Sequence, residues 1–382
     1  MAGKSWDVVV VGAGNAAFCA ALAARENGAN VLMVERAPKE LMGGNSRFTA
    51  GAFRCVYDGV DDLKAIMPDL TKEEVERSDF GTYTTDQFYD DMFRITNYRT
   101  DGDLCDRLVG RSRDAMRWLH GKGMKFDPIW GRQAYLIDGK FKFWGGLTVE
   151  AKGGGPGLVE QHLSLAQKQG IEIVYGTRAF ELIYDGNVVR GVKVKVNGAI
   201  VLRQPNNFAW QVFDGKIVPM LRDEYRIKRV SKVSANTIEE FAHKLEGVNA
   251  EAFLDEIKKY NAAVKKDVTF NPNVKDGRCT VGLDINKSNW ANTIEEPPFE
   301  AYQVGCGVSF SFGGVRIDPD SGQVIDSDMN PIPGLYAAGE LVGGIFYFNY
   351  PGGTGLMSGA VFGRTAGTSA ARSVARTLTA AK

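Results

Sequence analysis

Residues 6–17 read Trp-Asp-Val-Val-Val-Val-Gly-Ala-Gly-Asn-Ala-Ala, and this stretch decides the fold. The continuous apolar run that ends at Val11 is typical of a strand buried on both faces of a parallel sheet. The Gly-x-Gly-x-x-Ala pattern that follows predicts a tight turn into a helix over residues 15–27. A second strand over residues 30–34 is followed by Glu35. This succession predicts a Rossmann-type dinucleotide-binding unit.

Each position of the turn has a physical role in holding a dinucleotide. Gly12 permits the tight turn, Gly14 lets the backbone approach a pyrophosphate, and Ala17 lets the helix pack closely on the strand. The positive end of the helix then faces the phosphates. Glu35 lies where an acid accepts hydrogen bonds from the adenosine ribose and disfavours a 2′-phosphate. A tight strand–helix turn without a nucleotide is the alternative, but the acid in register favours FAD or NAD.

Two further segments favour FAD over NAD. Residues 42–51, Met-Gly-Gly-Asn-Ser-Arg-Phe-Thr-Ala-Gly, offer backbone N–H groups and hydroxyls for a second approach to the cofactor, with a plain polar loop as the alternative. Residues 334–340, Gly-Leu-Tyr-Ala-Ala-Gly-Glu, predict a short strand that ends in a glycine and an acid. Residues 352–356, Gly-Gly-Thr-Gly-Leu, open a predicted helix over residues 357–374 that can stabilise negative charge on a reduced flavin.

The composition is that of an ordinary globular protein and excludes several classes of function. Among 382 residues, Lys+Arg and Asp+Glu balance at 46 each, so no basic surplus indicates a nucleic-acid partner. The five cysteines are scattered and the three histidines fit ordinary core or surface positions, so we expect no disulfide framework, metal site or haem attachment. The sequence has no signal-peptide pattern and no apolar run that spans a bilayer, so the cytoplasm is the expected location.

These motifs together resemble the fumarate reductase/succinate dehydrogenase flavoprotein superfamily, and within it most closely the FAD-dependent tricarballylate dehydrogenase-like branch. The resemblance covers nearly the whole chain. It implies an α/β fold with a Rossmann-type, glutathione-reductase-like FAD-binding domain and a smaller α+β cap or substrate domain. We expect a discontinuous FAD-binding domain over residues 1–204 and 301–382 and a cap domain over residues 205–300.

The resemblance also implies which residues contact the cofactor. Those assigned to the pyrophosphate and ribose are Gly12, Gly14, Asn15, Ala16, Ala17, Glu35, Arg36, Gly43, Gly44, Asn45 and Ser46. Those assigned to the rest of FAD are Thr49, Ala50 and Gly51 beside the flavin, Ala179 near the adenine, Gly339 and Glu340 at the ribityl chain and the pyrophosphate, and Gly353, Thr354, Gly355 and Leu356 at the isoalloxazine ring. The histidine that binds flavin covalently in succinate dehydrogenases falls near Asn45, so the resemblance implies non-covalent FAD.

The chain departs from the family pattern in three ways. Residues 192–196 should run on into a strand that ends in an Ala-x-Gly-Gly-Phe turn, but residues 199–205 already resemble a much later part of the family, so a long internal piece is missing. The arginine proton donor and a histidine of fumarate reductases belong to that piece. The C-terminal substrate arginine aligns with Tyr350, and the substrate histidine aligns near residues 309–311. Fumarate reduction itself is therefore not favoured.

The predicted function is hydride transfer between flavin N5 and a small organic acid or enone, in C–C dehydrogenation or C=C reduction. Tyr350 is the first candidate to handle the proton, with packing under the Gly-Gly turn as its alternative. Tyr347 and Ser311 are weaker candidates. Arg54 can pair with a substrate carboxylate or form a structural ion pair.

Two other functions stay open at this point. The chain can be an FAD-binding protein that lost catalysis with the missing piece, or an electron-transfer flavoprotein subunit. The expected partners are a small-molecule substrate and an external electron acceptor or donor, with no nucleic acid and no integral membrane segment.

Overall fold

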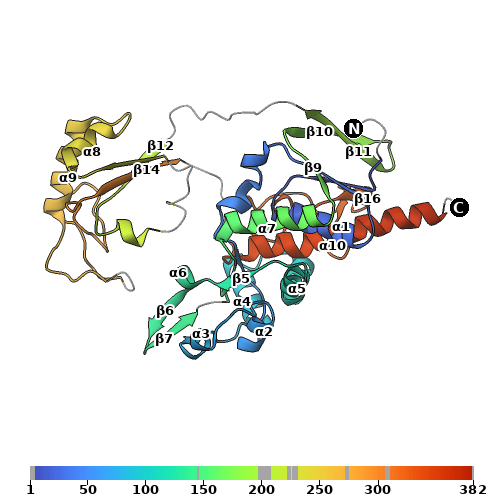
Figure 1. Ribbon diagram of the computed structural model, residues 1–382, viewed down its shortest axis with the longest axis horizontal. Coiled ribbons are helices and arrows are strands. Elements are labelled where there is room, and N and C mark those ends of the chain that lie inside the picture. The colour runs from blue at the N-terminus through green and yellow to red at the C-terminus, as the bar shows by residue number, and fades with distance from the viewer. Residues whose placement is uncertain are drawn as a thin grey trace. The chain divides into compact units, whose positions relative to one another are not determined.

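The computed structural model describes residues 5–143, 146–196, 208–221, 225, 231–271, 275–305 and 310–380. The chain divides into two compact units, which are described separately (Figure 1). Unit 1 comprises Met1–Val201 and Val308–Lys382, and unit 2 comprises Leu202–Gly307.

Unit 1 is built on a parallel sheet with the strand order β1 (Val8–Val11), β2 (Val31–Val34) and β9 (Glu172–Val174). Val8 pairs with Val31, and Leu32 pairs with Glu172. The four residues of β2 are buried, because β2 is the central strand of the three. Helix α1 (Asn15–Glu26) makes the crossover from β1 to β2. The predicted Rossmann-type fold is thereby confirmed.

Helix α1 packs along α10 (Thr354–Ala380), and α7 (Gly154–Lys168) packs against α1 as well (Figure 1). The contact of α1 with α10 depends on small residues. A Cβ atom on Gly363 would lie 2.5 Å from the Ala16 carbonyl oxygen, and one on Gly367 would collide with the Ala20 carbonyl. Helix α10 therefore approaches the backbone of α1 directly, and it begins at Thr354, three residues before the predicted start.

The hairpin of β10 (Thr177–Tyr184) and β11 (Val189–Val196) leaves the sheet at the end of β2. At its base, the Thr177 N–H donates to the Glu35 carbonyl at 2.8 Å. Near its turn, the backbone of Val189 packs against Gly334 of β16 (Pro331–Tyr336), which pairs with β15 (Gln323–Ile325). Beyond Ala179, four large apolar or aromatic side chains of β10 are exposed: Phe180, Leu182, Ile183 and Tyr184.

The second edge of β1 carries no strand among the described residues. Val9 is 37% exposed and Val11 is 56% exposed, while Val8 and Val10 pack on the main core. The junction expected over residues 199–205 lies outside the described residues.

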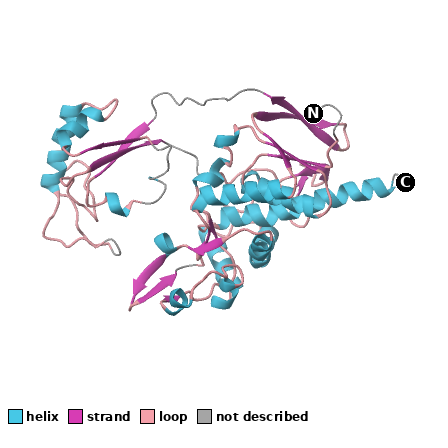
Figure 2. Ribbon diagram, viewed as in Figure 1, coloured by secondary structure: helices cyan, strands magenta, loops and turns pink. Residues whose placement is uncertain are grey.

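The rest of unit 1 consists of helices and short strands (Figure 2), with one main hydrophobic cluster and a small second one of Ala52, Ile129 and Leu147. The strands form two small sheets, β3 (Ala52–Phe53), β8 (Val149–Ala151) and β5 (Phe126–Pro128), and β4 (Ser78–Asp79), β7 (Lys140–Phe143) and β6 (Ala134–Ile137). The helical elements are η1 (Lys39–Leu41), η2 (Gly44–Phe48), α2 (Val60–Lys64), α3 (Lys72–Glu76), α4 (Thr85–Ile95), α5 (Gly102–Gly121), α6 (Trp130–Gln133) and η5 (Gly339–Leu341).

Unit 2 is an antiparallel sheet with the order β12 (Phe208–Phe213), β14 (Phe299–Gly305) and β13 (Lys232–Ala235). Helix α8 (Ile238–Lys244) packs on this sheet and on α9 (Ala250–Ala263), and a single 3₁₀ turn, η3 (Val218–Met220), follows β12. Its core centres on Phe241 and Phe299. This is the expected α+β composition of the smaller unit.

The close approach of α10 to α1 predicts opposite effects for two helical glycines. Gly367→Ala places a methyl group on the Ala20 carbonyl, so we expect the free energy of unfolding to fall by about 1–3 kcal/mol. Gly110→Ala in α5 meets nothing within 4 Å, so we expect it to rise by about 0.5–1 kcal/mol. Urea unfolding followed by circular dichroism measures both. Equal effects of the two substitutions would contradict the direct backbone packing.

Candidate cofactor-binding site and active site

The turn into α1 presents its backbone to an anion. Gly12 has a φ of +111°, a conformation that favours glycine, and its N–H donates to the Val34 carbonyl at 2.8 Å. Gly14 is the N-cap and has no side chain that could cap the helix, and the first turn contains no acid. Since the first N–H groups of a helix have no partner within it, those of Ala16 and Ala17 are available to a phosphate.

Glu35 follows β2 at the same edge of the sheet. Its Oε1 accepts a hydrogen bond from the Ala37 N–H at 2.7 Å, which fixes the carboxylate. Its Oε2 has no partner among the described residues, so it can accept from a ribose hydroxyl. Burial and the charge of Glu35 raise the pKa of the neighbouring Tyr175. Arg36 is exposed beside it.

Glu340 joins the two ends of the chain. Its Oε2 accepts from Asn45 Nδ2 at 3.3 Å, and its Oε1 accepts from the Ser311 N–H at 2.9 Å and from Ser311 Oγ at 3.1 Å. Gly339 has a φ of +79°, and a Cβ there would lie 2.7 Å from Ala16 Cβ. Predicted cofactor contacts from η2, η5 and α1 therefore lie next to one another.

Asn15 ties three predicted cofactor segments together. It is 3% exposed, and its backbone N–H donates to Ser46 Oγ at 3.0 Å. Its side-chain Nδ2 donates to the Leu356 carbonyl at 2.8 Å, and its Oδ1 lies 2.9 Å from His162 Nε2. Sequence reasoning missed His162, which reads there as an ordinary core or surface histidine. The sequence around His162 fits the apolar face of a helix and gives no indication that the ring bonds to Asn15.

The segment after η2 is fixed by short-range bonds. Thr49 Oγ1 donates to the Ser46 carbonyl at 2.9 Å and accepts from the Gly51 N–H at 3.0 Å. Gly51 has a φ of +72° and lies against Gly154, while Gly44, with a φ of +52°, has open space around it.

Three other predicted cofactor contacts lie nearby in the sequence or in the hairpin. They are Gly43, which packs on Val159, Ala50, which is half-buried, and Ala179, which pairs with Val194 in the hairpin.

Arg54 holds the Gly352–Gly353 turn through hydrogen bonds to its backbone. It is 7% exposed; its Nε donates to the Gly352 carbonyl at 2.8 Å, and its backbone N–H donates to the Gly353 carbonyl at 3.3 Å. Its Nη1 lies 3.1 Å from Asp91 Oδ2 and 2.9 Å from the Tyr83 hydroxyl. Burial raises the pKa of Tyr83 above its usual range. Arg54 therefore forms a structural ion pair with Asp91, which was the alternative to pairing with a substrate carboxylate.

Tyr350 belongs to an aromatic cluster at the start of α10. Its ring stacks on Phe310 with the centroids 4.9 Å apart, and it meets Phe346 edge-on at 5.8 Å. Phe310 in turn lies against Gly355, where an added Cβ would be 2.8 Å from the ring. The Tyr350 hydroxyl has no partner in the described part of the chain. Thr354 is buried and its hydroxyl donates to the Pro351 carbonyl, which closes the turn.

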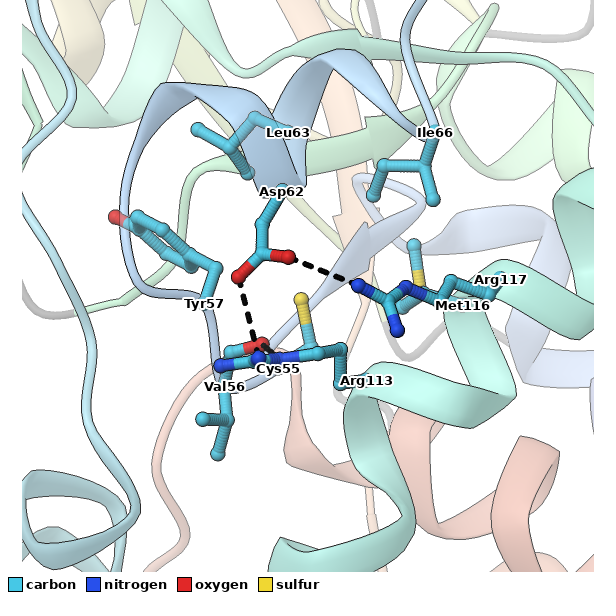
Figure 3. A pocket seen from close by; sticks show the side chains of 9 residues that line it. All are labelled: Cys55, Val56, Tyr57, Asp62, Leu63, Ile66, Arg113, Met116 and Arg117. Carbon is cyan, nitrogen blue, oxygen red and sulfur yellow. Dashed lines mark hydrogen bonds and ion pairs between the residues drawn. The ribbon is translucent and has the colours of Figure 1, made fainter.

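A separate hollow lies between α2 and α5 (Figure 3). Asp62 spans it, with Oδ2 at 3.3 Å from Arg113 Nη1 and Oδ1 at 2.9 Å from Arg117 Nη2. Burial raises the pKa of the Cys55 thiol there to about 12, so the thiol is unreactive at neutral pH. The space suits about one water molecule and is no substrate site.

The described residues contain neither a cluster of metal ligands nor a membrane-spanning helix. No group of three or more His, Cys, Asp and Glu side chains there is placed to hold a metal ion. Within the same residues, no helix combines the length and the apolar character needed to cross a membrane.

The geometry of both chain ends fits FAD. A helix N-terminus that keeps the Ala16 and Ala17 N–H groups available, an acid at the ribose position and open space at Gly44 suit the ADP half. A glycine turn ahead of α10 suits the flavin half. Exposed apolar side chains also lie in these segments, with Val11 at 56%, Phe48 at 71% and Leu341 at 60% exposure. A large, partly apolar cofactor would cover such side chains.

Comparison with known proteins gives the same assignment. The family described as FAD binding domain matches residues 7–209 and 203–356. The chain is 24% identical over 483 residues to a probable fumarate reductase, Ifc3, of Shewanella frigidimarina, covering 97% of this chain and 75% of that protein. It is 25% identical over 481 residues to the NADH:fumarate oxidoreductase of Klebsiella pneumoniae, covering 97% of this chain and 48% of that protein. The open flavocytochrome c3 fumarate reductase structure matches with a TM-score of 0.68 at 21% identity, over 97% of this chain and 79% of that one.

These matches also bear on the missing internal piece. An alignment over 483 positions is longer than this chain of 382 residues, so more than 100 of its positions have no residue here. The family match falls into two parts that meet at residues 203–209, close to the predicted junction. The chain belongs to the FAD binding domain family and is an FAD-dependent oxidoreductase of the fumarate reductase/succinate dehydrogenase flavoprotein superfamily.

Proposed function

We propose that this protein moves a hydride between FAD and two adjacent carbons of a small organic acid or enone, in C–C dehydrogenation or C=C reduction. One observation carries the proposal: Asn15 and Glu340 join the segments predicted for the pyrophosphate to those predicted for the flavin. Bound FAD supplies the hydride chemistry at flavin N5. The tricarballylate dehydrogenase-like branch stays a prediction.

The residues that would hold FAD come from both parts of unit 1. The first turn of α1 would bind the pyrophosphate, and Glu35 Oε2 would accept from the ribose. We assign this role to a FAD-binding domain over residues 1–204 and 301–382, and a substrate-covering role to residues 205–300. Because the described sheet ends at β1, we expect FAD to bind more weakly than a sheet with a further strand would allow.

Tyr350 is the proposed proton-handling residue. Its hydroxyl is without a partner among the described residues, and its ring is held by Phe310 and Phe346 beside the Gly355 turn. A fixed ring with a free hydroxyl can donate a proton to a substrate carbon or remove one. The Ser311 hydroxyl is engaged with Glu340 and the Arg54 guanidinium with Asp91, so we propose that these two act by positioning.

The reaction also needs partners. We propose a small-molecule substrate and an external electron acceptor or donor, since the five scattered cysteines match no sequence pattern for haem attachment or an Fe–S cluster. We propose the cytoplasm as the site of action, because a scattered set of cysteines is typical of a reducing compartment. A second candidate function, FAD binding without catalysis, is favoured by the missing internal piece.

The first test is catalytic. The FAD-loaded protein is reduced anaerobically with dithionite, and its reoxidation by a panel of α,β-unsaturated acids and enones is followed at the flavin absorption band. With a substrate so identified, we expect Tyr350→Phe to slow reoxidation by about 10²–10⁴-fold, because the proton donor is removed. Tyr98→Phe, an exposed tyrosine whose ring stacks on Phe93, is the matched control and should leave the rate unchanged. Reoxidation by no member of the panel would favour FAD binding without catalysis.

The second test concerns the ribose contact. Glu35→Gln removes a charged acceptor, so we expect the Kd for FAD, measured by quenching of FAD fluorescence, to rise by about tenfold. Glu40→Gln, an exposed neighbour, should leave the Kd unchanged. An equal change in both variants would mean that net charge alone is responsible and that Glu35 makes no ribose contact.

A further inference from the structure

His162 lies in the core of unit 1, on α7, and is fully buried. Its ring stacks on Phe18 of α1, with the centroids 5.2 Å apart and the planes 4° from parallel. Its Nε2 lies 2.9 Å from Asn15 Oδ1. A polar ring in such a place costs free energy unless it makes a hydrogen bond that the fold needs.

The surrounding bonds determine which way both groups face. Asn15 Nδ2 donates to the Leu356 carbonyl at 2.8 Å, so the amide oxygen must be the atom that faces His162. His162 Nε2 therefore carries the hydrogen and donates it. The other ring nitrogen, Nδ1, is left as a buried acceptor without a partner among the described residues. Burial lowers the pKa of His162 to about 3, so the ring stays neutral at physiological pH.

Asn15 depends on this single strong donor. The Cys19 thiol also approaches Asn15 Oδ1, but at 3.9 Å and as a weak donor. Without His162, the amide oxygen would be buried with no adequate partner, and the amide would be free to rotate away from Leu356. The link between the start of α1 and the start of α10 would then be lost, while Ser46 would remain bound only to the backbone N–H of Asn15.

We infer that His162 is a positioning residue for FAD, which acts by holding the Asn15 amide so that α1 and α10 present the pyrophosphate and flavin contacts in one fixed arrangement. The inference rests on the FAD site proposed above and extends it to a residue outside the predicted cofactor contacts, which is linked to them by its hydrogen bond to Asn15. Its effect on the cofactor is indirect.

The test compares variants that keep or remove the donor. His162→Gln retains an N–H that can reach Asn15 Oδ1, whereas His162→Leu removes it at similar volume. We expect the Kd for FAD of His162→Leu, measured by fluorescence quenching, to be about tenfold higher than wild type and that of His162→Gln to be within about threefold. Leu165→Ala, buried on the same helix, is the control for lost packing: its thermal unfolding temperature falls and its Kd does not change.

A double-mutant cycle separates positioning from general destabilisation. In an Asn15→Ala background, His162→Leu should have no further effect on the Kd, because the group through which it acts is gone. Equal losses in both backgrounds would overturn the inference, as would an unchanged Kd in His162→Leu. If His162→Leu does not fold, His162→Asn, which is too short to reach Asn15, replaces it in the cycle. A wild-type protein that binds no FAD would overturn the cofactor site itself, whereas wild-type binding without coupling overturns only the role of His162.

Discussion

The contact of α1 with α10 is the interaction on which the rest of unit 1 depends. These helices come from opposite ends of the chain, and Gly363 and Gly367 let them meet backbone against backbone. Their N-termini therefore open at neighbouring places, one after Gly14 and the other after Gly353. A long cofactor with a charge at its middle and a redox ring at one end needs two such helix starts in a fixed relation.

Polar side chains then hold what the helix contact brings together. Asn15 binds to Leu356, Asn45 to Glu340 and Arg54 to the Gly352 carbonyl. Each bond joins residues about 300 positions apart in the chain, and Asn15 and Arg54 are buried. Because a buried polar group is costly when unpaired, each bond also penalises arrangements in which the two ends separate. The same side chains therefore hold the predicted cofactor contacts in place and keep the two ends of the chain together.

The sequence was sufficient for features whose signal is local. Gly12, Gly14 and Glu35 lie within one strand–helix–strand unit, so their spacing alone predicted the nucleotide fold. The bond of His162 to Asn15 and the choice of Asp91 as the ion-pair partner of Arg54 could not be predicted, because tertiary packing brings together residues 147 and 37 positions apart. The resemblance located Tyr350, but only the coordinates reveal the ring cluster that holds it. Residues 306–309 lie outside the described residues, so the predicted alignment at residue 309 stays a prediction.

The edge of β1 that pairs with no described strand has a consequence for how this protein behaves in a crowded solution. Among the described residues, the strand that ends in the nucleotide turn is also the outermost strand of its sheet, and Val9 and Val11 on it are exposed. Natural edge strands are protected by lysine, proline or a bulge, and residues 8–11 contain only valine. Self-association through this edge would therefore act directly on Gly12 and the start of α1. A change at β1 would therefore affect both the solubility of this protein and its retention of the cofactor.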